Sequence, residues 1–458
     1  MSSSEAIGFD AVIVGAGQAG PPLAGRLSEA GQTVAVVERK LVGGTCVNYG
    51  CIPTKTLVAS AYAAHLARRG AVYGISTGDV TVDMSKVKGR KDGIVTADRD
   101  GVESWLEGMD GCTLLRGHAR FVDPHTLQVG DQLITGKKIF LNTGGRATVP
   151  DIPGLADVDY LTNVGILDLD TVPEHLVIIG GSYIGLEFAQ MFRRFGAEVT
   201  VVERGPRLAS REDDDVCAAI KDILEREGIT IHLDSNDIRV SRDGDGVAVS
   251  TGSAVVKGSH LLVAVGRVPN TDDLGLGKAG VATDSRGYIT VDDQLRTTAD
   301  HIWAMGDCNG KGAFTHTSYN DFEIVAANLL DDEPRRVSDR IPTYALYIDP
   351  PLGRAGMTEA QVRASGRKAL VGKRPMTRVG RAVEKGETQG FMKVVVDAET
   401  NQILGAAILG VGGDEVVHCI LDLMSAKAPY TTMTHTVHIH PTVAELVPTM
   451  LEGLRPLQ

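Results

Sequence analysis

The chain has 458 residues, of which 43% are hydrophobic and 23% charged, and its formal net charge is −12 at pH 7. This length exceeds what one hydrophobic core supports and predicts two or three domains of an ordinary globular protein. The composition excludes a nucleic-acid binder, which needs a basic surplus, and the chain has no run of the ~18 apolar residues that a membrane span needs.

The first predicted element is a βαβ unit over residues 9–38. Residues 9–14 form an apolar run typical of a buried parallel strand, and GAGQAG follows at 15–20, before a helical stretch. The glycines allow a tight turn and let a pyrophosphate approach a helix N-terminus. Glu38 ends the second strand, 18 residues after Gly20, where a ribose-binding carboxylate is expected. The unit predicts a dinucleotide site formed by Gly15, Gly17, Gly20 and Glu38.

Two cysteines separated by four residues follow in GGTCVNYGCIPTK, at 43–55. The intervening Asn and Gly favour a turn that brings Cys46 and Cys51 within bonding distance, and the proline suits the first turn of a helix. A thiol at a helix N-terminus has a lowered pKa. Two buried cysteines without a redox role are the alternative. Residues 1–6 lack the pattern of a signal peptide, so we expect a reducing cytoplasm, where a close pair favours catalysis or metal binding.

A second nucleotide-binding unit is predicted from about residue 173. A strand at 138–141 runs into Asn142-Thr143-Gly144, and prolines then indicate a boundary. The strand at 176–179 precedes GGSYIG at 180–185, with Ser in place of the middle glycine, and the strand at 198–202 ends in Glu203. The second unit therefore repeats the first, and two dinucleotide sites indicate a flavin and a nicotinamide.

The last part of the chain contains three further features. A strand at 261–265 leads to Gly266, and a strand at 301–305 leads to Asp307. From about 340 the composition changes, with strands at 391–396 and 403–409 and a helix at 415–425. The other four cysteines have no motif spacing, so we interpret them as packing residues and predict no metal site.

Taken together, these motifs resemble the flavin-dependent pyridine nucleotide–disulfide oxidoreductases, which include dihydrolipoamide dehydrogenase, glutathione reductase and mercuric reductase. The matching motifs, which cover nearly the whole chain, are GAGQAG with Glu38, GGTCVNYGCIPTK, GGSYIGLEFA, AVGRVPN, MGDC, DPPLGRAGMTEA and HIHPTVAE. The resemblance implies an α/β enzyme with two Rossmann-like dinucleotide-binding domains and a C-terminal α+β dimerisation domain. The expected FAD-binding domain covers 1–150 and 271–338, the NAD(P)-binding domain 151–270, and the dimerisation domain 339–458.

The resemblance also assigns roles to individual residues. Cys51 is expected to lie against the flavin as the thiolate, and Cys46 to attack the substrate. Lys55 and Glu187 resemble the ion pair near the flavin N5, and Tyr183 the aromatic side chain that covers the nicotinamide pocket. His440 and Glu445 resemble the acid/base dyad, which acts on the partner subunit's Cys46 in a homodimer. The expected cofactor contacts are Gly15, Gly17, Gly20, Glu38, Gly44, Thr45, Lys55, Thr143, Gly144, Gly180, Tyr183, Gly185, Glu187, Glu203, Arg204, Gly266 and Asp307.

The substrate is less closely defined. The stretches 349–359 and 447–454 resemble the mercuric reductase branch, but the chain lacks that branch's C-terminal cysteine pair and carries a histidine at 440. We therefore expect a disulfide or dithiol substrate, small or protein-bound, and no nucleic acid or membrane partner. A metal ion, a quinone or an oxidant is the alternative acceptor. A non-enzymatic subunit of a complex is disfavoured, because every catalytic position is filled.

The choice of nicotinamide cofactor also has two readings. Glu203 would bind a ribose 2′-OH and repel a 2′-phosphate, which favours NADH. Arg204 and Arg207 could accept the phosphate, so NADPH stays open.

Overall fold

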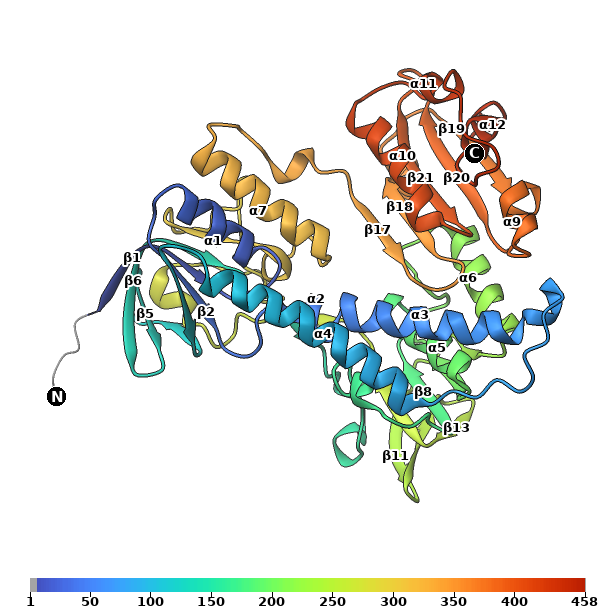
Figure 1. Cartoon of the computed structure of the whole chain (residues 1–458), viewed down its shortest axis with the longest axis horizontal. Coiled ribbons are helices and arrows are strands. Elements are labelled where there is room, and N and C mark those ends of the chain that lie inside the picture. Colours follow the sequence, from blue (N-terminus) through green and yellow to red (C-terminus); the bar gives the residue numbers. More distant parts are fainter. Residues whose placement is uncertain (1–5, 458) are drawn as a thin grey trace. The chain divides into compact units, whose positions relative to one another are not determined.

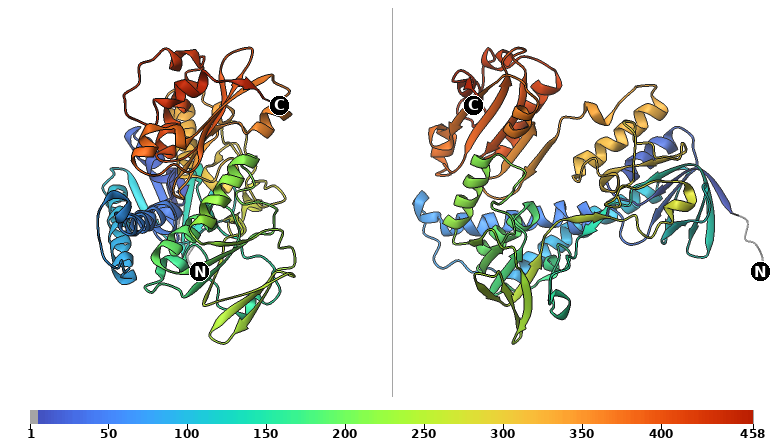
Figure 2. Two further views of the ribbon diagram at one scale, coloured as in Figure 1. Left: turned by 90° about the vertical axis from the view of Figure 1, so that its right-hand side faces the viewer. Right: turned by 180° about the vertical axis from the view of Figure 1, so that it is seen from behind.

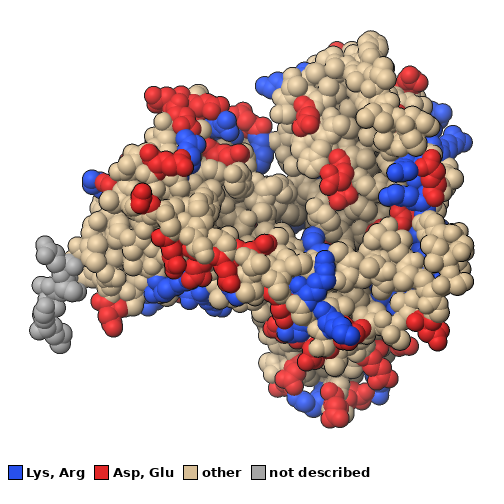
Figure 3. Space-filling model, viewed as in Figure 1, with Lys and Arg blue, Asp and Glu red and all other residues tan. Residues whose placement is uncertain are grey.

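The computed structural model describes residues 6–457, and the chain divides into two compact units (Figure 1). The first unit comprises Met1–Thr56, Lys88–Thr148 and Gly266–Arg340, and the second comprises Leu57–Val87, Val149–Val265 and Ile341–Gln458. None of the helices within 6–457 is both long and apolar enough to cross a membrane. Acidic and basic side chains are interspersed over the face shown in Figure 3.

The first unit is built on a sheet with the strand order β3-β2-β1-β6-β5-β4, in which β16 also pairs with β6. The pairs β3–β2, β2–β1, β1–β6 and β6–β16 are parallel, as a doubly wound nucleotide-binding fold requires. Its strands are β1 (Ile7–Val14), β2 (Val34–Glu38), β3 (Cys112–Arg116), β4 (Ala119–Phe121), β5 (Thr126–Val129), β6 (Gln132–Leu141) and β16 (Ile302–Ala304), and β7 (Gly145–Ala147) pairs separately with β15 (Arg267–Pro269). Its helices are α1 (Gly20–Glu29), α2 (Gly44–Tyr49), most of α4 (Met84–Glu107) and α7 (Thr315–Leu330).

The second unit contains a smaller parallel sheet with the order β10-β9-β8-β14, and an antiparallel sheet of β11, β12 and β13. The strands are β8 (His175–Ile179), β9 (Glu198–Val202), β10 (Thr230–His232), β11 (Arg239–Asp243), β12 (Gly246–Ser250), β13 (Val255–Gly258) and β14 (His260–Val263). The helices are α5 (Tyr183–Phe195), α6 (Asp214–Arg226) and α3 (Cys51–Arg68), which begins in the first unit. Phe188 and Phe192 of α5 are buried and belong to the hydrophobic core of the parallel sheet.

The second unit also contains an antiparallel sheet with the order β17-β18-β21-β20-β19-β22. Helix α10 packs against β18 and β21, and α12 packs against β19 and β20 (Figure 2). All seven residues of β20 and of β21 are buried, because both faces of the sheet are covered. The elements are β17 (Thr343–Leu346), β18 (Leu352–Gly356), β19 (Ala369–Pro375), β20 (Phe391–Asp397), β21 (Ile403–Leu409), β22 (Arg455–Pro456), α8 (Glu359–Ala364), α9 (Gly380–Glu384), α10 (Gly413–Ser425), α11 (Thr431–Thr434) and α12 (Leu446–Leu451).

The predicted α/β class is confirmed, and the differences lie at element ends. The strand predicted at 138–141 is the last part of the ten-residue β6. The strands predicted at 261–265 and 301–305 are shorter, as β14 and β16. Apolar runs locate such strands, but their ends depend on pairing with neighbours from elsewhere in the chain.

Candidate active site

Both predicted fingerprints form turns that only glycine fits. Gly15 has φ +105°, and a Cβ on it would lie 2.2 Å from the Asn142 carbonyl oxygen. A Cβ on Gly20 would lie 2.5 Å from the Gly15 oxygen. Gly180 and Gly185 repeat both features, with φ +115° and a Cβ distance of 2.1 Å from Gly185 to the Gly180 oxygen. A side chain at any of these positions would displace backbone.

The two predicted ribose-binding acids are held in the same way. Each carboxylate accepts hydrogen bonds from the backbone N–H after the first glycine of its fingerprint and from the backbone N–H two residues after itself. The distances are 2.9 and 2.7 Å from Ala16 and Lys40 to Glu38, and 2.6 and 2.7 Å from Gly181 and Gly205 to Glu203. Each oxygen keeps a lone pair for a ribose hydroxyl.

These residues fit two dinucleotides. Within residues 6–457, α5 has no side-chain hydrogen bond capping its N-terminus, so its first-turn N–H groups are available to a pyrophosphate. In α1 the first turn contains Pro21 and Pro22, which have no N–H, and the Gly20 N–H donates to the Gly17 oxygen at 3.0 Å, so there a pyrophosphate would approach the glycine turn instead. Each helix follows a glycine turn that brings backbone close to the expected phosphate position. The two units thus fit the expected FAD and the expected nicotinamide dinucleotide, and the assignment of each cofactor to its unit stays a prediction.

The other expected flavin contacts lie in the first unit. A Cβ on Gly44 would lie 2.8 Å from the Gly17 Cα, so the cysteine-containing segment packs directly on the fingerprint. Burial raises the pKa of Asp307, and Arg267 Nη2 lies 3.4 Å from its carboxylate. The remaining members of this set are Thr45, Thr143, Gly144 and Gly266.

Asp321 in α7 is a buried acid that the sequence analysis missed. Its Oδ2 accepts hydrogen bonds from the Gly306 N–H and from Asn309 Nδ2, both at 2.8 Å, and Arg340 pairs with Oδ1. Burial raises the pKa of Asp321. These bonds fix the turn that carries Asp307. The only sequence signal is a charged residue beside apolar neighbours in a helix.

Cys46 and Cys51 are in the thiol form and lie on consecutive helices. Cys46 is the third residue of α2, and Cys51 is the first residue of α3. Cys51 Sγ lies 3.2 Å from Oγ1 of Thr315, the first residue of α7. The hydrogen bond with Cys51, followed by burial, raises the pKa of Cys46. The lowered thiol pKa expected at a helix N-terminus concerns Cys51, the first residue of α3, and stays a prediction.

Thr315 is a second residue that the sequence did not identify, and its substitution gives a testable prediction. Thr315→Val is expected to slow alkylation of Cys51 by iodoacetamide at pH 7 about tenfold, since a hydrogen bond to a charged group contributes ~1.5–3 kcal/mol. The rate is measured on dithiol enzyme by mass spectrometry of the Cys51 peptide. Thr315→Ser keeps the hydroxyl and should alkylate at the wild-type rate. Equal rates in the Val and Ser variants would contradict this role.

The predicted ion pair and the predicted nicotinamide cover belong to different parts of the chain. Lys55 lies in α3 within the first unit. Glu187 is buried in α5 of the second unit, where its Oε1 accepts a hydrogen bond of 3.0 Å from the Tyr347 N–H. The pairing of Lys55 with Glu187 stays a prediction. Tyr183 is the first residue of α5 and donates its hydroxyl to Glu212 at 2.7 Å.

His440 and Glu445 form a dyad within the second unit. His440 Nδ1 lies 3.0 Å from both carboxylate oxygens of Glu445, which assigns the Nδ1 proton to the shared bond. The His440 side chain is 79% exposed, whereas that of Glu445 is 15% exposed. The nearby His438 instead lies 3.0 Å from the Thr436 carbonyl oxygen. The imidazole is thus oriented by a carboxylate and accessible to a second molecule.

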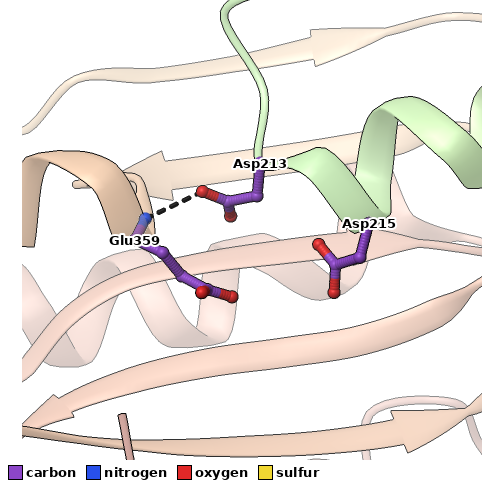
Figure 4. A group of neighbouring side chains, drawn as sticks. All are labelled: Asp213, Asp215 and Glu359. Carbon is purple, nitrogen blue, oxygen red and sulfur yellow. Dashed lines mark hydrogen bonds between the residues drawn. The ribbon is translucent and has the colours of Figure 1, made fainter. Parts of the chain in front are cut away.

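Three acidic groups of the second unit come together outside these sites (Figure 4). Oxygens of Asp213, Asp215 and Glu359 lie within 4.8 Å of one another, and the Glu359 N–H donates to Asp213 at 2.8 Å. The Lys393 ammonium lies 2.9, 2.6 and 2.6 Å from the three carboxylates. Each carboxylate also pairs with a second cation, Arg354 with Asp213, Lys373 with Asp215 and Arg363 with Glu359, so cationic side chains of the protein balance this charge.

Comparison with known proteins then decides the family. Residues 9–321 match the pyridine nucleotide-disulphide oxidoreductase family, and residues 342–451 match the dimerisation domain of the same family. The chain belongs to this family. The predicted resemblance is confirmed, and the chain is a flavin-dependent oxidoreductase that uses FAD and NAD(P)H and carries the family's dimerisation domain.

Three relatives of this oxidoreductase bear on its activity. It is 38% identical to "Probable pyridine nucleotide-disulfide oxidoreductase RclA" of Escherichia coli, over 95% of this chain and 97% of that protein. It is 33% identical to a mercuric reductase of Bacillus cereus (93% and 70% covered) and 35% identical to a dihydrolipoyl dehydrogenase of Haloferax volcanii (96% and 95%). The solved "HOCl-induced flavoprotein disulfide reductase RclA" superposes with a TM-score of 0.90 at 37% identity, covering 97% and 99% of the two chains, and it is also solved as a Cu(II) complex with the same values.

Proposed function

We propose that Cys46 and Cys51 are the redox-active pair through which this oxidoreductase reduces a disulfide substrate. The observation that carries the proposal is the packing of the cysteine-containing segment on the nucleotide fingerprint, at Gly44 and Gly17. Both sulfurs and the Thr315 hydroxyl then lie beside the expected flavin site. Bound FAD supplies the two-electron connection between NAD(P)H and the cysteine pair.

The proposed exchange is balanced in atoms and electrons. The Cys46 thiolate attacks one sulfur of the substrate disulfide, so that a mixed disulfide forms and the first substrate thiolate leaves. The Cys51 thiolate then attacks the Cys46 sulfur, which releases the second substrate thiolate and forms the Cys46–Cys51 disulfide. Two electrons from NAD(P)H restore both thiols, and two protons neutralise the products.

The raised pKa of Cys46 supports a role for the dyad. A thiol that is protonated at neutral pH needs a base before it can attack. His440, oriented by Glu445 and exposed, has the chemistry to take this proton and to return one to the departing thiolate. We place it opposite the partner subunit's Cys46, which makes the homodimer the active form.

The proposed organisation keeps the three predicted domains. FAD binds to residues 1–150 and 271–338, the nicotinamide dinucleotide binds to 151–270, and 339–458 form the dimer contact. We place the reaction in the cytoplasm, a reducing compartment in which a close cysteine pair favours catalysis over a structural disulfide.

The contacts of Glu203 support NADH as the preferred reductant. Its two backbone hydrogen bonds hold a negative charge where a 2′-phosphate would lie. Arg207, one of the two arginines considered for that phosphate, pairs with Asp214. Of the two arginines, this leaves Arg204 to attract a 2′-phosphate against the repulsion by Glu203.

Substitution of Glu203 tests this preference. Glu203→Gln removes the charge that repels a 2′-phosphate and is expected to reduce the ratio of kcat/KM for NADH to that for NADPH about tenfold. This ratio is measured for the wild type and for the variant with the same disulfide acceptor. Arg204→Gln is the matched variant and should shift the ratio towards NADH. A wild-type preference for NADPH would contradict the assignment.

The proposed function is tested with the purified holoenzyme and a panel of disulfides. Oxidation of NADH coupled to release of two thiols per NADH is expected for at least one of lipoamide, glutathione disulfide and a protein disulfide. Turnover with quinones but with no disulfide would overturn the proposal.

A metal ion is the second candidate acceptor. It is supported by the Cu(II) complex solved for RclA, which shares 37% identity with this chain. If Cu(II) is the acceptor, NADH oxidation should depend on Cu(II) without any disulfide, and one NADH should reduce two Cu(II) to Cu(I).

A further inference from the structure

A buried carboxylate of the second unit holds the residue expected to cover the nicotinamide pocket. Glu212 lies just before α6, and its side chain is fully buried. Its Oε1 accepts hydrogen bonds from two phenols, at 2.7 Å from Tyr183 and 2.6 Å from Tyr344. The two rings also contact each other, with centroids 5.6 Å apart.

The two phenol hydroxyls supply the hydrogen bonds that the buried Glu212 carboxylate accepts. Its Oε2 has no hydrogen-bond partner among residues 6–457, and the nearest cation, Arg354 Nη1, lies 3.8 Å away. Burial, followed by the Glu212 charge, raises the pKa values of Tyr183 and Tyr344, so both phenols keep their protons and donate them. A buried carboxylate with one unpaired oxygen binds its remaining donors strongly.

The carboxylate itself cannot follow a moving tyrosine. The next residue, Asp213, pairs with Arg354 and Lys393, each at 2.9 Å, and both of these side chains are buried. The segment before α6 is therefore anchored to β18 and β20, which carry the two cations. If Tyr183 swings to admit a nicotinamide ring, its bond to Glu212 has to break.

We propose that Glu212 is a positioning residue that lowers the affinity for the nicotinamide dinucleotide by holding Tyr183 in its closed position, and that Tyr344 moderates this hold. The proposal rests on the proposed function, since it takes Tyr183 as the cover of the nicotinamide pocket. Tyr344 competes with Tyr183 for one oxygen, so it weakens the hold on Tyr183. This makes the two tyrosines act in opposite directions.

The test is the affinity of the oxidised holoenzyme for NAD⁺ or NADP⁺, whichever the wild type binds more tightly. The Kd is determined from the change in flavin fluorescence on titration. Tyr183→Phe keeps the ring but removes the bond that must break, so Kd should fall about tenfold. Tyr344→Phe leaves Oε1 to Tyr183 alone, so Kd should rise about threefold. In the double variant Kd should equal that of Tyr183→Phe, because Tyr344 acts only through Tyr183. Glu212→Gln, which removes the charge, should lower Kd about threefold.

Tyr62→Phe is the matched control, because Tyr62 donates a similar bond of 2.7 Å to Glu387 in the same unit. Its Kd should equal that of the wild type. Shifts of Tyr183→Phe and Tyr344→Phe in the same direction, or Kd values of both within twofold of wild type, would overturn the proposal. Thermal unfolding of each variant separates a folding defect from a change in affinity. Failure of the proposed function would appear separately, as wild-type turnover with quinones but with no disulfide.

Discussion

Cys46→Ser is expected to lower disulfide reduction on the order of 10³-fold or more while leaving electron transfer to quinones. A serine hydroxyl can neither form a mixed disulfide nor close one with Cys51, whereas a quinone can take electrons directly from reduced flavin. The measurement is NADH oxidation by one enzyme preparation with a disulfide and with a quinone. The ratio of the two rates is the informative quantity, because it cancels differences in flavin content.

Cys419→Ser is the control for that experiment. Cys419 lies in α10, and its Sγ contacts the Val416 carbonyl oxygen at 3.1 Å, which fits a packing role. Its variant should keep both rates. Disulfide reduction by Cys46→Ser at the wild-type rate would contradict the cysteine mechanism.

His440→Ala is expected to lower kcat for disulfide reduction by about 10²- to 10³-fold, the usual contribution of a positioned acid/base group. The variant should also have a different pH profile. The pKa of Cys46 is raised, so without a base the thiolate fraction grows with pH beyond the usual thiol range, and the residual rate should still be rising at about pH 9. In the wild type the histidine removes this dependence, and the rate should level off near neutral pH.

Two further variants sharpen the assignment of the dyad. Glu445→Gln keeps the shape but not the charge that orients His440, so a smaller loss of about tenfold is expected. His438→Ala removes a nearby histidine that has no carboxylate contact of this kind, and it should keep the wild-type rate. Equal losses in His438→Ala and His440→Ala would remove the reason for choosing His440.

The features that could be predicted from the sequence are those whose physical cause is local. Gly15 and Gly180 are recognisable because each follows an apolar strand directly and begins a short glycine pattern, and both adopt a positive φ, +105° and +115°, that favours glycine. The dyad follows from the resemblance of HIHPTVAE to the family motif, and His440 and Glu445 do contact each other at 3.0 Å. The cysteine pair is recognisable from its short spacing, whereas Glu203 is recognisable because it ends the second strand of its unit, 18 residues after Gly185, as Glu38 does after Gly20.

The features that could not be predicted are contacts between distant segments. Thr315 lies 264 residues from Cys51, and Tyr344 lies 132 residues from Glu212. Neither contact leaves a periodic or motif pattern, since each arises from the packing of complete elements. The raised pKa of Cys46 is only partly of this kind, because its first cause is the hydrogen bond with the nearby Cys51 and only its second cause, burial, depends on the fold around α2.

The most direct test of the central claim is an anaerobic titration of the purified holoenzyme with NADH, followed by its visible spectrum. The account predicts a long-wavelength charge-transfer band at two-electron reduction, which requires the Cys51 thiolate beside oxidised flavin. That band should be absent in Cys51→Ser. Direct bleaching of the wild-type flavin without such a band would mean that the cysteine pair is bypassed, and would contradict the disulfide reductase mechanism.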